Sequence, residues 1–205
     1  MAPTEVHLIT SNANKLADIK SILAPAGISV RNQAIDLPEI QGSIEDISIA
    51  KCRRAAEIIG GPVIIDDTAL CFNALNGLPG PYIKSFLEAL GPEKLHLLLE
   101  GFSDKSAQAV ATIGYSEGPG YEPILFQGRI SGRIVSARGL LKYGWQACFE
   151  VEEGNQTLAE MSDDEKHKIS HLGKALQKLV EWLRMDSNPG EKTPNALSCE
   201  SFVLP

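Results

Sequence analysis

Two adjacent carboxylates, Asp66 and Asp67, directly follow the apolar run formed by residues 62–65. Such a run predicts a buried strand, and open α/β sheets often build sites where their strands end. Carboxylate oxygens also suit Mg²⁺, which usually binds one or two protein carboxylates together with substrate phosphates. The same acids could instead open a solvated loop or cap a helix. The pair is therefore a candidate catalytic centre whose assignment depends on the rest of the chain.

A candidate anion site lies near the N-terminus, where the predicted strand at residues 6–9 leads into Thr10, Ser11 and Asn12. The apolar spacing of residues 16–23 predicts a helix that Ser11 or Asn12 could cap. A strand, a short polar turn and a helix N-terminus together form a ready anion-binding arrangement. Lys15 lies in the first turn, where the helix dipole disfavours a cation. A bound anion would explain this lysine, although surface lysines occur anywhere.

Two further charged residues, Lys51 and Glu39, are candidates for the same site. Residues 44–59 predict a helix whose apolar stripe consists of Ile44, Ile47, Ala55, Ile58 and Ile59. Lys51 falls on this stripe, so its ammonium needs either a phosphate or carboxylate partner or a route to solvent. Glu39 lies in a turn-rich loop at residues 37–42 and could be either a third oxygen ligand or an ordinary loop acid.

Aromatic residues in the C-terminal half could add a base-binding surface. Tyr143 and Trp145 flank Gly144, and such a pair can form a stacking slot, although aromatics more commonly pack in a core. Lone histidines such as His171 more often have a structural role. His171 lies beside the apolar stripe of a final helix that is expected to pack on the sheet and that carries Leu172, Leu176, Leu179 and Leu183.

The remaining pattern predicts an α/β domain at residues 1–185 and a disordered tail at residues 186–205. The expected elements are strands at residues 28–30, 107–115 and 124–135, with a hairpin turn at 118–120, and helices at residues 92–99 and from Ser162. Lys84 is expected on a short helix after the turn-rich loop at residues 76–81.

Composition limits the classes of partner. The formal net charge of −7 argues against a nucleic-acid partner, which would require a basic face, but it does not exclude a nucleotide. No apolar run approaches the 18 residues of a membrane span, and no segment resembles a signal peptide. The widely spaced Cys52, Cys71, Cys148 and Cys199 are expected to be reduced thiols in a cytoplasmic protein.

Taken together, the motifs resemble those of the inosine triphosphate pyrophosphatases over about residues 4–184. The motifs that carry the resemblance are Thr10 to Lys15, Leu37-Pro38-Glu39, Asp66-Asp67-Thr68, Asn73 to Lys84, Ala159-Glu160-Met161 and Ser170-His171. The resemblance implies an elongated mixed sheet with helices on both faces, in two lobes around a central nucleotide cleft. It also implies a homodimer that hydrolyses ITP, dITP and XTP to the monophosphate and pyrophosphate with Mg²⁺, and it leaves open whether Mn²⁺ can replace Mg²⁺.

The resemblance also implies residue roles. Glu39 and Asp67 would bind the metal, and Asp66, Asp67 and Lys15 would be the catalytic groups. The residues implied to bind the substrate are Thr10, Ser11, Asn12, Lys15, Lys51, Thr68, Lys84, Tyr143, Gly144, Trp145, Gln146, Lys166, Ser170, His171 and Leu172.

This sequence departs from the family pattern at three positions. Gln146 and Leu172 occupy positions where the family typically has Asp and Arg, which are implied to recognise the purine, and Asp66 stands where many relatives have Glu. Leu172 could simply extend the apolar stripe of the final helix. Alternatively, the residues that select the purine base have been lost, and the protein is a repurposed relative that acts on another nucleotide or a specialised metabolite. A third interpretation is a non-catalytic nucleotide-binding or interaction protein, against which the retained acids and lysines weigh. The sequence leaves these interpretations open.

Overall fold

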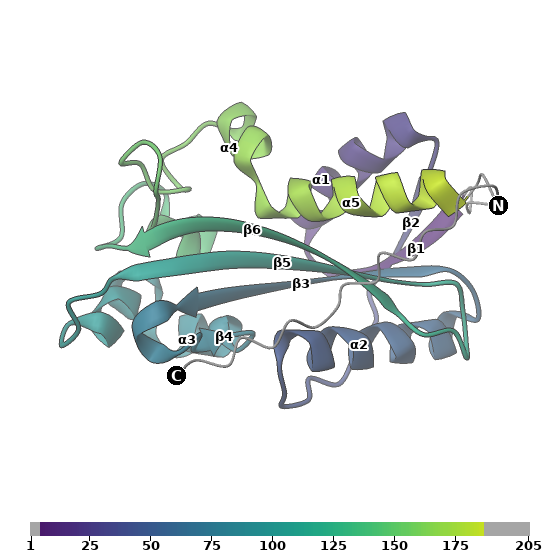
Figure 1. Cartoon of the computed structure of the whole chain (residues 1–205), viewed down its shortest axis with the longest axis horizontal. Coiled ribbons are helices and arrows are strands. Elements are labelled where there is room, and N and C mark those ends of the chain that lie inside the picture. Colours follow the sequence, from purple (N-terminus) through teal and green to yellow (C-terminus); the bar gives the residue numbers. More distant parts are fainter. Residues whose placement is uncertain (1–4, 187–205) are drawn as a thin grey trace.

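The computed structural model describes residues 5–186, which form one mixed sheet with helices on both faces (Figure 1). The strands are β1 (Glu5–Ile9), β2 (Ser29–Gln33), β3 (Val63–Phe72), β4 (Pro79–Gly80), β5 (Ser106–Ser116), β6 (Ile124–Ile134) and β7 (Phe149–Val151). The α-helices are α1 (Ala13–Leu23), α2 (Ile44–Ile59), α3 (Ile83–Leu90), α4 (Asp163–Ile169) and α5 (His171–Asp186), and the 3₁₀ helices are η1 (Ala24–Ala26), η2 (Asn73–Leu75), η3 (Pro92–Leu99) and η4 (Leu141–Ala147).

The sheet has the strand order β2-β1-β3-β5-β6-β7, and β4 pairs with β3 beside this path. The β1–β2 and β1–β3 pairs are parallel, whereas all the other strand pairs are antiparallel. Helix α5 packs on β5 and β6 across one face, and α2 covers β3 and β5 on the opposite face (Figure 1). The predicted α/β class with an elongated mixed sheet is confirmed.

The alternation of side chains along the central strands separates the core into layers. Ile64 of β3 packs with α1 and α5, whereas Val63 and Ile65, which point to the opposite face, pack with α2. A third cluster lies at the other end of the long strands, where Leu70 and Phe72 pack with α3, η3 and β7. The sheet therefore has apolar packing on both faces at one end and a separate core at the other.

The sheet is divided at the middle of β3. Strand β1 reaches only as far as Ile65, and β4 begins opposite Leu70. Residues 66–69 of β3 therefore have no strand partner on that side within the described part of the chain. This gap separates two helix-covered regions of the sheet, and it contains the two adjacent carboxylates.

Helix boundaries follow local capping chemistry. Ser43 and Asp46 form a capping box at the start of α2, and Gly60 ends this helix in the left-handed conformation with φ of 75°. Ser162 and Glu165 form a second capping box at the start of α4, which confirms the predicted helix start.

Three predictions about the elements were incomplete or wrong. Strand β3 does not end at the carboxylates but continues through them to Phe72. The predicted helix at residues 92–99 consists of 3₁₀ turns. Ile58, assigned to the apolar stripe of α2, is 45% exposed. The proposed tail lies outside the described residues, apart from Asp186, which ends α5.

Two further findings concern the thiols and membrane spanning. Cys52, Cys71 and Cys148 are free, and burial raises the pKa of Cys52 and of Cys148 to about 12. Burial makes Cys52 and Cys148 unreactive thiols, whereas Cys71 is only partly buried and Cys199 lies outside the described residues. Among residues 5–186, no helix has both the length and the apolar character needed to cross a bilayer.

Gly128 allows α5 to approach β6 closely. A Cβ atom at this position would lie 1.9 Å from the His171 carbonyl oxygen and 2.7 Å from the Ala175 nitrogen. Both atoms are backbone, so the first turn of α5 would have to move. We expect Gly128→Ala to lower the free energy of unfolding by at least about 2 kcal/mol, measured by urea denaturation. Gly101→Ala, where a Cβ would have no neighbour within 4 Å, is the control, and equal effects of the two substitutions would contradict this explanation.

Candidate active site

Asp66 and Asp67 point toward opposite faces of the sheet because they are consecutive residues of one strand. Asp66 faces α1 and α5, and Asp67 faces α2. The prediction that both acids emerge together from the end of a strand is therefore wrong. Both lie in the gap between β1 and β4, however, and each remains close enough to affect the other electrostatically.

The Asp66 side of the gap is organised by Lys15. The Lys15 ammonium lies 2.7 Å from Asp66 Oδ2 and donates a hydrogen bond to Thr68 Oγ1 at 3.0 Å. The Asp66 side chain is only 1% exposed. Helix α1 positions Lys15 because Asn12 caps it, accepting a hydrogen bond from the Lys15 amide at 3.2 Å. The Thr10 hydroxyl in turn accepts one from the Asn12 amide at 3.1 Å, which shapes the polar turn.

His171 begins α5 on the same side of the gap. Its Nδ1 atom is buried without a hydrogen-bond partner among the described residues, and its ring lies edge-on to Trp145 with centroids 5.8 Å apart. Burial lowers the pKa of His171 to about 4, although the nearby Asp66 carboxylate opposes this shift. The imidazole is therefore neutral at pH 7.

The lowered pKa of His171 predicts a loss of stability in mild acid. A histidine with a pKa of about 4 when folded and 6.5 when unfolded binds fewer protons in the folded state. Its contribution is therefore constant above pH 6.5, and stability falls as the pH drops from there toward 4. Between pH 7 and pH 5, wild type should lose about 2 kcal/mol more than His171→Asn in urea unfolding. His7→Asn serves as a control, and an unchanged pH dependence in His171→Asn would refute the prediction.

The Asp67 side contains the other charged candidates. Lys51 Nζ lies 3.3 Å from Asp67 Oδ2 and 3.5 Å from Glu39 Oε1, and Lys84 Nζ lies 3.8 Å from the same Glu39 oxygen. Burial raises the pKa of Asp67, and the Lys51 ammonium opposes this effect. Of the two alternatives for Lys51, the carboxylate partner is the one found, since its side chain is only 15% exposed.

Glu39 and Asp67 fit a hard divalent cation by their chemistry and placement. The Lys51 ammonium reaches both carboxylates within 3.5 Å, so a single cation can lie between them. Two carboxylates would leave coordination positions for water and phosphate oxygens, as Mg²⁺ usually requires. No group of three or more His, Cys, Asp or Glu side chains suited to a metal occurs in residues 5–186.

Tyr82, which the sequence did not single out, fixes the loop that carries Glu39. Its hydroxyl accepts a hydrogen bond from the Gly42 amide at 3.0 Å and donates one to the Gly42 carbonyl at 3.1 Å. The only sequence signal was its position in the motif from Asn73 to Lys84 that carries the family resemblance. Neither contact could be inferred, because 40 residues separate the partners.

The aromatic candidates fall into two groups. The Lys166 ammonium lies 4.0 Å from the centre of the Tyr143 ring, joining α4 to η4. Trp145 packs edge-on against Phe149, with ring centroids 5.9 Å apart, so part of its surface belongs to the core. Gly144 adopts φ of 62° and ψ of −130°, which bends η4 between these two aromatic residues.

The remaining candidates include residues whose contacts are structural. Leu172 is 9% exposed and packs in the same apolar cluster as Leu176, which favours its interpretation as part of the helix stripe. Ser170 caps α5 through a hydrogen bond to its hydroxyl from the Gly173 amide at 3.2 Å. The backbone carbonyl of Gln146 accepts a hydrogen bond from the Ala159 amide at 3.2 Å, and Ser11 is exposed.

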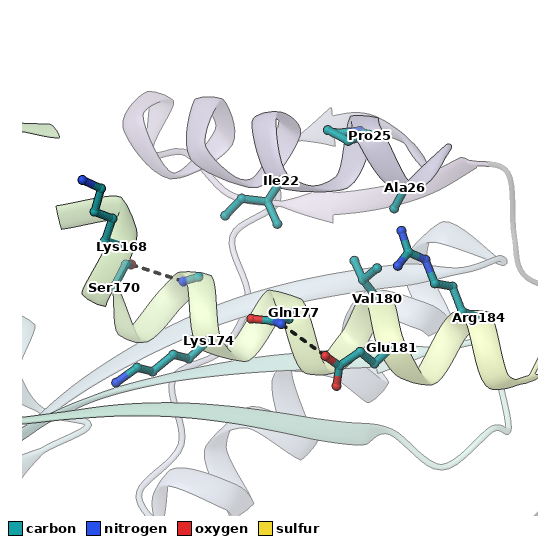
Figure 2. A pocket seen from close by; sticks show the side chains of 11 residues that line it. Ile22, Pro25, Ala26, Lys168, Ser170, Lys174, Gln177, Val180, Glu181 and Arg184 are labelled. Atoms are coloured by element: carbon teal, nitrogen blue, oxygen red, sulfur yellow. Dashed lines mark hydrogen bonds between the residues drawn. The ribbon is translucent and has the colours of Figure 1, made fainter. Parts of the chain in front are cut away.

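A separate hollow of about 380 Å³ lies between α1 and α5 (Figure 2). Its lining combines apolar side chains such as Ile22 and Val180 with charged ones such as Lys168 and Arg184. Ser170 is the only predicted site residue in its lining. This hollow is therefore distinct from the clusters around Asp66 and Asp67.

The fold defines the class of this molecule: an α/β protein whose lysines and carboxylates converge where its mixed sheet is divided. The model of the Ham1 family matches residues 6–182, and the chain belongs to this family. It is 59% identical over 185 residues to an inosine triphosphate pyrophosphatase of Phaeosphaeria nodorum, covering 89% of this chain and 97% of that protein. It is 60% identical over 177 residues to that of Neurospora crassa, covering 86% and 91%.

Solved structures agree with this assignment. A HAM1 protein from Coxiella burnetii superposes with a TM-score of 0.81 at 30% identity, covering 88% of this chain and 98% of that one. The Staphylococcus aureus Ham1 protein gives a TM-score of 0.76 at 31% identity, covering 89% and 99%. The resemblance identified from the motifs is thus confirmed at the level of sequence family and fold.

Proposed function

We propose that this protein hydrolyses the non-standard purine nucleoside triphosphates ITP, dITP and XTP to the monophosphate and pyrophosphate. The observation that carries the proposal is that the Glu39 and Asp67 carboxylates both contact the Lys51 ammonium, while Lys84 contacts Glu39 as well. Two carboxylates and two lysines at one point suit a metal-bound triphosphate. The relatives at 59–60% identity bear the name of this activity.

The proposed roles follow from the chemistry of each residue. Glu39 and Asp67 would hold Mg²⁺, which would neutralise charge on the phosphate oxygens. With the carboxylates bound to the cation, Lys51 and Lys84 would be available to the phosphates. Lys15 and the polar turn at residues 10–12 contact the triphosphate at the N-terminus of α1.

The reaction requires a water oxygen to bond to the α-phosphorus while the bond from that phosphorus to the bridging oxygen breaks. Pyrophosphate leaves with that oxygen, and the water loses a proton. A carboxylate in the gap can orient the water and accept the proton, and Asp66 and Asp67 are the two that lie there. Aspartate is one methylene shorter than the glutamate that many relatives have at position 66, so the attacking water would be held differently here.

The base would lie near Tyr143 and Lys166, whose ammonium lies over the Tyr143 ring. Gln146 can both donate to and accept from a purine edge, whereas an aspartate can only accept. Leu172 is not included among the base-binding residues, because its side chain packs in the core. We further propose that the protein is cytoplasmic and, from the family resemblance, that it is a homodimer. Light scattering of the purified protein would test the oligomeric state.

The deciding experiment measures Mg²⁺-dependent pyrophosphate release from ITP, XTP, dITP, GTP, ATP and dTTP. Wild type and Gln146→Asp are compared at several substrate concentrations. Preference of wild type for ITP, XTP and dITP supports the proposal. Absence of turnover with all three in wild type, at any Mg²⁺ concentration, would overturn it and favour a repurposed relative. A gain for ITP in Gln146→Asp would locate base choice at that residue.

A further inference from the structure

Three residues form a polar row across one face of the sheet. Thr112 of β5 pairs in register with Asp67 of β3 on one side and with Gln127 of β6 on the other. Directly paired residues of neighbouring strands point to the same face. Asp67 contacts α2 through Lys51, so the whole row faces that helix.

Helix α2 carries a matching series of polar residues above this row. Glu45, Ser48 and Lys51 are three residues apart and so lie along one side of the helix. At the two ends of the row, a side chain of α2 contacts the strand residue directly. Lys51 Nζ lies 3.3 Å from Asp67 Oδ2, and Glu45 Oε1 accepts a hydrogen bond from Gln127 Nε2 at 2.7 Å.

The middle pair consists of Ser48 and Thr112. Cys52, one turn after Ser48, packs over Gly114, because a Cβ at Gly114 would lie 3.3 Å from the Cys52 Cβ. Gly114 lies two residues beyond Thr112 on the same face of β5. Glu45, in the turn before Ser48, lies over Gln127, and Cys52, in the turn after it, lies over Gly114. Ser48 therefore lies above Thr112.

Both central hydroxyls are fully enclosed and unsatisfied. Ser48 and Thr112 are each 0% exposed, and neither hydroxyl oxygen has a hydrogen-bond partner among the described residues. Leaving two buried hydroxyls unpaired side by side is unfavourable. Buried water molecules typically bridge such groups and become part of the structure.

We propose that Ser48 and Thr112 hold one buried water molecule between α2 and β5. The water bridges the two hydroxyls and sets the height of α2 above the sheet. That height determines how Lys51 lies over Asp67, so Ser48 and Thr112 are positioning residues for the candidate metal-binding carboxylate. The consequence for metal binding rests on the proposed function, whereas the water bridge itself does not.

Thermal unfolding without metal or nucleotide tests the bridge directly. Ser48→Ala and Thr112→Val each remove one hydroxyl with little change in shape, and Ser131→Ala on exposed β6 surface is the control. Each buried variant should lower the Tm by about 2–4 °C because the other hydroxyl loses its partner. The double variant should be no less stable than the less stable of the two single variants, because either substitution alone already breaks the bridge.

If no water links the two hydroxyls, the opposite result is expected. Each substitution would then raise the Tm, and the two increases would add, which would overturn the proposal. A crystal structure of wild type at about 1.5 Å should contain one ordered water within hydrogen-bonding distance of both oxygens, and a dry contact there would also overturn it.

The effect on the site is measured separately. In Thr112→Val, the Mg²⁺ concentration giving half-maximal pyrophosphate release should rise about 10-fold, with kcat unchanged at saturating Mg²⁺. An unchanged Mg²⁺ requirement in an active enzyme would refute the positioning role. If wild type does not hydrolyse any nucleotide, the proposed function fails, while the unfolding and crystallographic results still decide whether the water bridge exists.

Discussion

Replacing Asp67 with asparagine is expected to lower the rate of pyrophosphate release from ITP by about 10²–10³-fold. Asp67 is the more buried of the two carboxylates that meet at Lys51, with 18% of its side chain exposed against 57% for Glu39. An amide keeps the shape but loses the charge that binds a divalent cation and attracts Lys51. The measurement is steady-state release of pyrophosphate over a range of Mg²⁺ concentrations.

The control for this variant removes an exposed carboxylate from a neighbouring helix. Glu88→Gln on α3 changes the net charge by the same amount and should retain full activity. Circular dichroism and unfolding curves would establish that Asp67→Asn remains folded. Full activity in a folded Asp67→Asn protein would show that the site is not at the gap in the sheet.

Replacing Lys15 with methionine is expected to lower the free energy of unfolding by about 3 kcal/mol. The Asp66 carboxylate is 1% exposed and lies 2.7 Å from the Lys15 ammonium, so removing the lysine leaves a buried charge without its main partner. The hydrogen bond to Thr68 is lost as well. Urea denaturation at pH 7, without nucleotide or metal, measures this effect apart from any role in catalysis.

Two companion variants make the Lys15 result interpretable. Lys15→Met combined with Asp66→Asn should recover much of the lost stability, because the unpaired charge is removed. Lys20→Met changes an exposed lysine of the same helix and should alter stability by less than about 0.5 kcal/mol. Equal losses in Lys15→Met and Lys20→Met would indicate that the buried pair contributes nothing specific.

Local features of this protein followed from its sequence. The boundaries of α2 at residues 44 and 59 agree with its apolar spacing, and the capping box at Ser162 agrees with the start of α4. Both depend on contacts within a few residues of the chain, so spacing and residue type determine them. The need of Lys51 for a partner was also predictable, because a charge on a buried helix face is costly.

The tertiary structure decided which residues meet. Lys15 reaches Thr68, 53 residues away, and Tyr82 holds Gly42 across 40 residues. No spacing rule predicts such contacts, because they depend on strand order and register. The core position of Leu172 was one of two open interpretations, and packing of α5 on the sheet favoured it.

The pair of carboxylates shows most clearly what the sequence determined and what the tertiary structure decided. Residue types alone marked Asp66 and Asp67 as candidates for phosphate and metal chemistry. Only the structure revealed that β3 continues through them, which sends one to Lys15 and the other to Lys51 on opposite faces. The physical reason is that the alternation of side chains is fixed within a strand, whereas the extent of that strand depends on pairing with β5, which is distant in sequence.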